Sequence, residues 1–151
     1  MAQEFPDFDF SVVDPLYPDK TSNLSSNPYA FTGQAILARG QTCLRALYSR
    51  PEKVIAVVSH SGFLRVAIAN RRFFNADWRV FDYDEEKMKQ SKERGEGVDG
   101  QGFFSLKEWK ETEENGGGMG RSERGIFGME KGDYPEVDDE ATEEVPKKPT
   151  H

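Results

Sequence analysis

The sequence predicts an α/β fold. Residues 32–50 repeat their apolar side chains with a helical period, and residues 53–59 then form a continuous apolar run that is rich in β-branched residues. A strand buried on both faces of a sheet has this unbroken pattern. A second helical period follows the turn at residues 59–62, and a helix–strand–helix order is typical of a parallel sheet covered on both faces.

The chain begins with an irregular segment, Met1–Pro28, in which aromatic residues alternate with turn-forming Pro, Asp, Ser and Asn. A helix is expected from Thr32, a suitable N-cap, to Arg50, because Pro51 ends it. Gly40 lies within this helix and lowers its stability by about 1 kcal/mol relative to Ala. We expect another backbone to pack closely against it.

Shorter elements follow the central turn. The spacing predicts a short amphipathic helix from Phe63 to about Arg72, and a strand that includes Trp78–Tyr83. The charged, Gly-rich stretch Met88–Gly102 is expected to be a long loop, and Phe103–Trp109 a strand at the edge of the sheet.

The charge distribution divides the chain of 151 residues in two. Nine basic and seven acidic residues precede Asp82, whereas 11 basic and 20 acidic residues lie from Asp82 onward, which accounts for the net charge of −7. We predict a domain over residues 1–110 and an acidic, Gly-rich disordered tail over residues 111–151. The acidic total argues against nucleic-acid binding, since phosphate contacts need a basic surface.

The cysteine and histidine counts exclude several kinds of site. A single cysteine, Cys43, cannot form an internal disulfide and fits a reducing compartment, and with only His60 and His151 beside it a Cys/His zinc site is implausible. Neither a secretory signal nor an apolar run long enough for a membrane helix is present in the sequence. We therefore expect a cytoplasmic protein that needs no metal or cofactor and has no membrane partner.

The turn Ser59-His60-Ser61-Gly62 lies between the predicted strand and the next helix, where ligands bind in α/β proteins. It does not match a serine-hydrolase elbow, because Ser59 and Phe63 stand where Gly-x-Ser-x-Gly requires glycine. It also lacks the Gly-Lys-Ser/Thr of a phosphate-binding P-loop. An imidazole beside free backbone N–H groups can instead hold a phosphoryl group. Without a relative, a lone histidine at a strand end is more often structural.

The run Val57–Arg65 resembles the second histidine motif of the histidine phosphatase superfamily, the phosphoglycerate-mutase-like proteins. Its flanks strengthen the resemblance to the fungal branch of this family. They are Phe8-Asp9-Phe10, Asp14-Pro15-x-Tyr17-Pro18-Asp19-Lys20-Thr21, Ala35–Gly40 and Asn75-Ala76-Asp77. The similarity covers roughly residues 5–83. It implies the C-terminal half of a three-layer α/β/α sandwich, without the N-terminal strand and helices.

In that family a histidine in an Arg-His-Gly motif becomes phosphorylated, and the histidine matched by His60 helps to bind the transferring group. The resemblance thus implies His60 as the catalytic residue and Ser61 and Gly62 as substrate-binding residues that offer backbone donors. It also implies a phosphorylated small molecule as the substrate and hydrolysis of a phosphomonoester without a metal. This sequence has no Arg-His-Gly and no histidine before His60.

Because residues that act as a unit fail together, we expect no normal turnover from this chain alone. An alternative is a non-catalytic remnant that binds a phosphorylated ligand or a protein partner. Arg65, Arg71, Arg72 and Arg79 could form an anion patch near the turn, although solvated helix ends and strand edges account for them more simply. Ser59 and Ser61 could equally cap the helix. The acidic tail is most simply a solubilising extension, with partner binding as a second role.

Overall fold

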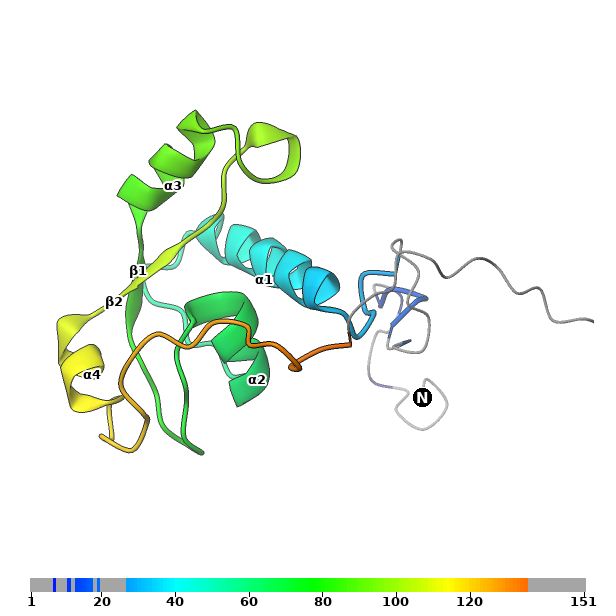
Figure 1. Cartoon of the computed structure of the whole chain (residues 1–151). Helices are drawn as coiled ribbons and strands as arrows, with labels where there is room; N and C mark the ends of the chain where they lie inside the picture. The colour runs from blue at the N-terminus through cyan, green and yellow to red at the C-terminus, as the bar shows by residue number, and fades with distance from the viewer. Residues whose placement is uncertain (1–6, 8–10, 12, 18, 20–26, 136–151) are drawn as a thin grey trace, which may run out of the picture.

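The computed structural model describes residues 7, 11, 13–17, 19 and 27–135 (Figure 1). Within them, helices surround one small sheet. The elements in chain order are helix α1 (Gly33–Tyr48), helix α2 (Ser61–Phe63), the π-helix η1 (Leu64–Ala69), strand β1 (Phe81–Tyr83), helix α3 (Glu85–Glu93), the 3-10 helix η2 (Val98–Gly100), strand β2 (Leu106–Glu108) and helix α4 (Lys110–Asn115). The irregular segment predicted at Met1–Pro28 lies mostly outside the described residues.

Helix α1 confirms the first predicted helix. Thr32 is its N-cap, and the Thr32 hydroxyl accepts a hydrogen bond from the Ala35 backbone N–H at 3.2 Å, which satisfies one of the free donors of the first turn. The apolar period buries Ile36, Gly40 and Leu44 on one face. The Tyr83 hydroxyl donates to the Leu44 carbonyl at 2.7 Å, and this bond ties the helix to β1.

The closest helix contact is made by Gly40. A Cβ atom at this position would overlap the Ala67 carbonyl group of η1, so only glycine allows the two backbones to approach. Ile36, Val66 and Ala67 form the buried cluster at this crossing, and Tyr134 packs against it from the C-terminal segment. The prediction of a close backbone approach at Gly40 is confirmed. The short helix predicted from Phe63 also forms, and it ends at Asn70, whose φ of 52° is left-handed.

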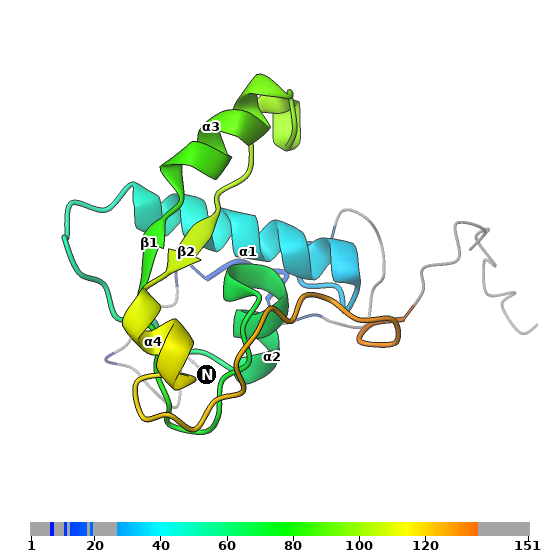
Figure 2. The same ribbon diagram turned by 60° about the vertical axis from the view of Figure 1, so that its left-hand side comes forward.

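The predicted central strand does not form. Residues 53–59 pair with no strand among the described residues, and every one of them is exposed, including Val54 at 90% and Val58 at 98%. Figure 2 shows the chain between α1 and α2 as an open loop at one side of the molecule. The prediction of a buried strand here is wrong for these residues. An apolar β-branched run becomes a strand only where another strand supplies hydrogen bonds, and none lies beside it.

The two strands that do form pair with each other. β1 and β2 are antiparallel, with Phe81 opposite Glu108 and Tyr83 opposite Leu106. Both lie inside predicted strands, so their existence is confirmed and the chain does combine helices with strands. The parallel, doubly covered sheet is wrong for the described residues, because the strand that would have been its centre is unpaired.

Helix α3 begins before the stretch predicted as a long loop and extends into it. Asp84 caps it by accepting a hydrogen bond from the Lys87 N–H at 3.1 Å, and Glu85 and Glu86 favour the positive end of the helix dipole. The prediction of a loop over Met88–Gly102 is therefore wrong for Met88–Glu93. These residues have little apolar character, so no hydrophobic period marks the helix.

The predicted tail is partly folded. Residues 111–115 complete α4, and the chain up to Pro135 then packs back along η1 and the loop before β1, which Figures 1 and 2 both show. The expected disorder is therefore wrong for residues 111–135, because hydrogen bonds described below hold them. For residues 136–151 the prediction lies outside the described part of the chain.

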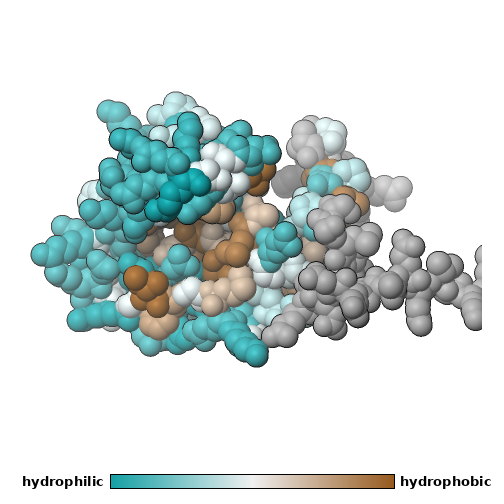
Figure 3. Space-filling model, turned by 45° about the horizontal axis from the view of Figure 1, so that its top comes forward, coloured by the Kyte–Doolittle hydropathy of each residue, from teal (hydrophilic) through white to brown (hydrophobic). Residues whose placement is uncertain are grey.

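The described residues enclose only a small apolar core. Its buried members are Ala30, Ile36, Leu44, Val66 and Ala67. Apolar side chains also remain at the surface, and on the face in Figure 3 they gather in a central strip between hydrophilic regions. None of the described helices is both long and apolar enough to cross a membrane.

The packing at Gly40 predicts the effect of a methyl group there. On helix propensity alone, Gly40→Ala would stabilise the protein by about 1 kcal/mol. Because the methyl group overlaps the Ala67 carbonyl, we expect a net loss of about 1–3 kcal/mol in the free energy of unfolding, measured by urea denaturation followed by circular dichroism. Ala38→Gly, at an exposed position of the same helix, is the control for propensity and should cost about 1 kcal/mol. A more stable Gly40→Ala protein would contradict the close packing.

Candidate functional site

His60 lies immediately before helix α2 and serves as its N-cap residue in an extended conformation, with φ −84° and ψ 143°. Its imidazole is exposed and makes no hydrogen bond to the described residues. The structure therefore places His60 at a helix N-terminus, as the strand–turn–helix pattern predicts. It does not place it in an enclosed cleft.

Ser61 and Gly62 form the first turn of the helix. Their N–H groups and that of Phe63 come too early to have intrahelical acceptors, and within the described chain none of the three has another acceptor. The Ser61 hydroxyl donates to the Phe73 carbonyl at 3.0 Å, which anchors the turn to the loop before β1. The alternative reading of Ser59 and Ser61 as helix caps is wrong, because His60 holds the cap position and no side chain caps the helix.

The arginines near the motif are engaged elsewhere. Arg65 donates to the Gly128 carbonyl at 2.7 Å and binds Asp133 at 2.7 Å. Arg72 pairs with Glu123 at 2.8 Å, and its guanidinium lies 4.5 Å from the centre of the Phe127 ring. The Arg65 guanidinium also lowers the pKa of the Asp133 carboxyl. These cations hold the C-terminal segment and do not form an anion patch around His60.

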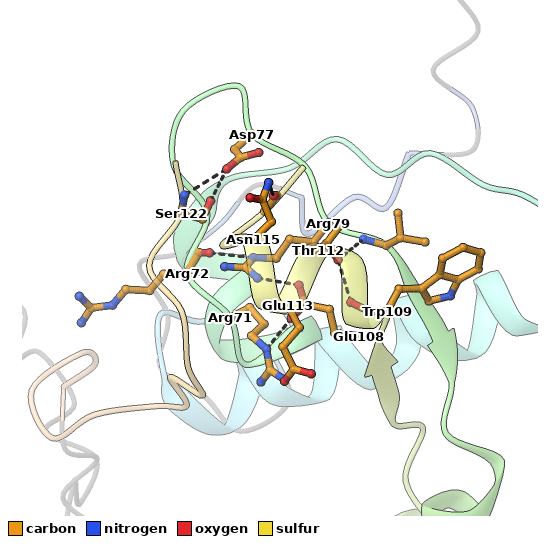
Figure 4. A network of polar contacts seen from close by, with 12 residues as sticks. Arg71, Arg72, Asp77, Arg79, Glu108, Trp109, Thr112, Glu113, Asn115 and Ser122 are labelled. Atoms are coloured by element: carbon orange, nitrogen blue, oxygen red, sulfur yellow. Dashed lines mark hydrogen bonds and ion pairs between the residues drawn. The ribbon is translucent and has the colours of Figure 1, made fainter. Parts of the chain in front are cut away.

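The other two arginines enclose a buried carboxylate, as Figure 4 shows. The Glu108 side chain has no solvent exposure, and its two oxygens accept from Arg79 and Arg71, each at 2.6 Å. Arg79 is 1% exposed and also donates to the carbonyls of Arg72 and Glu123 at 3.1 and 2.9 Å. Arg71 continues to Glu113 at 3.0 Å. The interpretation of Arg71 and Arg79 as solvated surface residues is wrong, because both belong to this network.

A second carboxylate, Asp77, is held by backbone donors. Its oxygens accept from the N–H groups of Met119 and Trp78 at 2.8 Å each, and from the Ser122 hydroxyl at 2.8 Å. The N–H groups of Arg121 and Ser122 add bonds of 3.2 and 3.1 Å. Desolvation of Asp77 acts to raise its pKa, but the hydrogen bonds to the ionised form outweigh it and lower the pKa to about 2.

The Gly116–Gly118 run allows this contact. A side chain at Gly117 would overlap the Asp77 carboxylate, and one at Gly118 would overlap the Trp78 ring. The Gly118 N–H also donates to the Trp78 carbonyl at 2.7 Å. The glycines that the sequence assigns to a disordered tail are therefore required for close packing against the loop before β1.

Three other features bear on chemistry. In the described part of the chain, no group of three or more His, Cys, Asp or Glu side chains could hold a metal ion. Cys43 is half-buried, and burial raises the pKa of its thiol, which fits a packing role. A cavity of about 330 Å³ lies between α3 and the loop before β2; its lining includes Tyr48, Lys92 and Phe104 but none of the motif residues.

Comparisons with protein families, with curated proteins and with solved structures give no match for this chain. The family resemblance of the motif therefore remains a prediction.

Sequence reasoning missed Asp77 and Glu108 as anchors. In the sequence, Asp77 stands out only as part of a flanking similarity, and Glu108 falls in a strand where a charge indicates an exposed edge. One signal was available for the Asp77 contact. A run of three glycines marks a place where backbone must approach another group closely.

The buried Glu108 network predicts a large loss of stability when its charge is removed. Glu108→Gln leaves two largely buried guanidinium groups facing a neutral amide, so we expect the free energy of unfolding to fall by about 3–5 kcal/mol in urea denaturation. Glu111→Gln makes the same charge change at an exposed position on α4 and should have an effect within about 0.5 kcal/mol. Equal effects of the two substitutions would show that the network does not stabilise the fold.

The Asp77 contacts predict a specific acid sensitivity. Because its pKa in the folded protein is lowered to about 2, the stabilisation is complete above the unfolded value near 4 and is lost as the pH falls toward 2. We expect the urea midpoint of the wild type to fall between pH 4 and pH 2, by the equivalent of about 1–2 kcal/mol more than that of Asp77→Asn. Asp99→Asn, at an exposed position, is the control and should leave the wild-type profile intact. Parallel profiles for the wild type and Asp77→Asn would contradict this role.

Proposed function

We propose that this chain corresponds to the C-terminal half of a phosphoglycerate-mutase-like histidine phosphatase domain. We also propose that this chain alone binds phosphate groups at His60 and does not hydrolyse phosphate esters. The parent domain would be a three-layer α/β/α sandwich that hydrolyses phosphomonoesters through a phosphohistidine. The observation that carries the proposal is the exposed imidazole beside the N–H groups of Ser61, Gly62 and Phe63, which have no acceptor in the described part of the chain.

The chemistry of this half-site suits an anion. Backbone N–H groups at a helix start point toward the preceding residue and carry the positive end of the peptide dipoles. Here the helical run is short, because α2 and η1 together extend only from Ser61 to Ala69. The contribution of the helix dipole is therefore small. The hydrogen bonds of the N–H groups and of the His60 imidazole would supply most of the binding energy.

Turnover would need groups that the described chain does not bring to His60. Phosphoryl transfer requires an in-line nucleophile and several cationic donors for the equatorial oxygens. Arg65 and Arg72 bind carboxylates instead, and the sequence contains no second histidine before the tail residue His151. The geometry therefore favours the non-catalytic form of the proposal, in which His60 keeps only the phosphate-binding role of the second histidine.

The test is a titration of the ¹⁵N-labelled full chain with inorganic phosphate, at constant ionic strength maintained with chloride. We expect weak, saturable shifts at the amides of Ser61, Gly62 and Phe63, which His60→Ala should reduce severalfold. His151→Ala changes the other histidine and should leave the shifts unchanged. Absence of shifts at these amides, or equal shifts in the wild type and His60→Ala, would contradict the binding site.

Hydrolysis is tested separately with a generic aryl phosphate. We expect no release of phosphate above the rate without protein, for either the wild type or His60→Ala. Turnover that disappears with His60→Ala would show that the site is complete in this chain, contrary to the proposal. Phosphate binding without turnover is the expected combination.

A further inference from the structure

The segment Val54–Val58 presents an apolar surface with free backbone groups. Val54 and Val58 are 90% and 98% exposed, whereas Ile55 and Val57 are 39% and 46% exposed. This alternation gives the segment an outward face and a half-covered inward face, as in a strand. Five successive apolar residues would not normally face water in a folded protein.

The backbone of this segment has the hydrogen-bonding capacity of an unpaired edge strand. From Lys53 to Ser59, no N–H or C=O group bonds to another part of the described chain. A run of backbone groups without partners, combined with β-branched side chains, can serve as a template for pairing with a second strand. A partner that matches both the backbone groups and the apolar side chains is another apolar segment that can pair as a strand.

We propose that Val54–Val58 pairs antiparallel with the same segment of a second copy of this chain, about a twofold axis at Ala56. The proposal concerns association and does not depend on phosphate binding at His60. In an antiparallel pair centred on Ala56, residues whose numbers sum to 112 lie opposite each other. Val54 then faces Val58 of the second copy, and Ile55 faces Val57.

The flanking residues are complementary in the same register. Glu52, whose carboxylate pairs with Arg50 of its own chain, falls opposite His60, and Lys53 falls opposite Ser59, so no like charges face each other across the pair. The smallest side chain, Ala56, lies on the axis, where two copies of one residue must share the space. A twofold pair of this kind uses the same surface on both copies and closes on itself.

The area that the two paired segments bury determines how strong the dimer should be. Two strands of five to seven residues bury less than the roughly 1,200 Å² typical of a stable interface, so the dimer should be weak and reversible. We expect a monomer–dimer equilibrium that shifts across the micromolar to millimolar range in sedimentation velocity of the full chain.

Paired charge variants test the register. Val54→Lys combined with Val58→Lys places like charges opposite each other and should abolish the dimer. Val54→Glu combined with Val58→Lys places opposite charges across the pair and should retain it. Both sites are exposed, so neither double variant should unfold the monomer, which circular dichroism checks. Equal effects of the two double variants would overturn the proposed register.

A cysteine at the axis gives an independent readout. In a Cys43→Ala background, Ala56→Cys should form a disulfide-linked dimer on mild oxidation, because the two Cα atoms opposite each other lie about 4.5–5.5 Å apart. Val54→Cys should crosslink far less, since its own counterpart lies several residues away along the partner strand. A monomer at every concentration, or equal crosslinking from the two sites, would overturn the proposal.

Discussion

The described fold depends on the ion pairs that the buried Glu108 carboxylate forms with two arginines. A charge without solvent exposure is tolerated only when it is fully paired, and here Arg71 and Arg79 each bind one of its oxygens at 2.6 Å. These three residues join strand β2 to the segment between η1 and β1, and the Glu113 bond to Arg71 adds α4. With few buried apolar residues in the described chain, this network fixes elements that a larger core would otherwise hold.

The same shortage of core explains why the C-terminal segment is part of the fold. Asp77 holds the loop at Met119–Ser122 through backbone N–H groups, and Arg65 holds Asp133. Tyr134 then covers the cluster between α1 and η1. Most of these contacts are charge-assisted or backbone hydrogen bonds, so they leave little trace in the hydrophobic pattern. Charge and glycine content alone make the segment look unfolded.

Whether an element can be predicted from the sequence depends on how it is stabilised. α1 was predictable because its cap, its apolar period and Pro51 all act locally, and Gly40 signalled its own close contact. The run at Val54–Val58 has the residues of a strand but does not form one, because a strand needs a neighbouring strand, which its own residues cannot reveal. α3 lacks an apolar face, although the acidic start at Asp84 was a usable signal. At the site, the position of His60 at a helix start was predictable, and its exposure was not.

The apolar segment Val54–Val58 and His60 are neighbours in the chain. Only Ser59 separates His60 from Val54–Val58, and on the helix side the Ser61 hydroxyl bonds to the Phe73 carbonyl. The His60 carbonyl accepts a hydrogen bond from the Leu64 N–H at 3.0 Å, whereas Val54–Val58 has no backbone hydrogen bond to the rest of the described chain. In the proposed register, pairing of Val54–Val58 sets Glu52 opposite His60. A carboxylate there competes with an anion for the imidazole, so strand pairing and phosphate binding would oppose each other at this one residue.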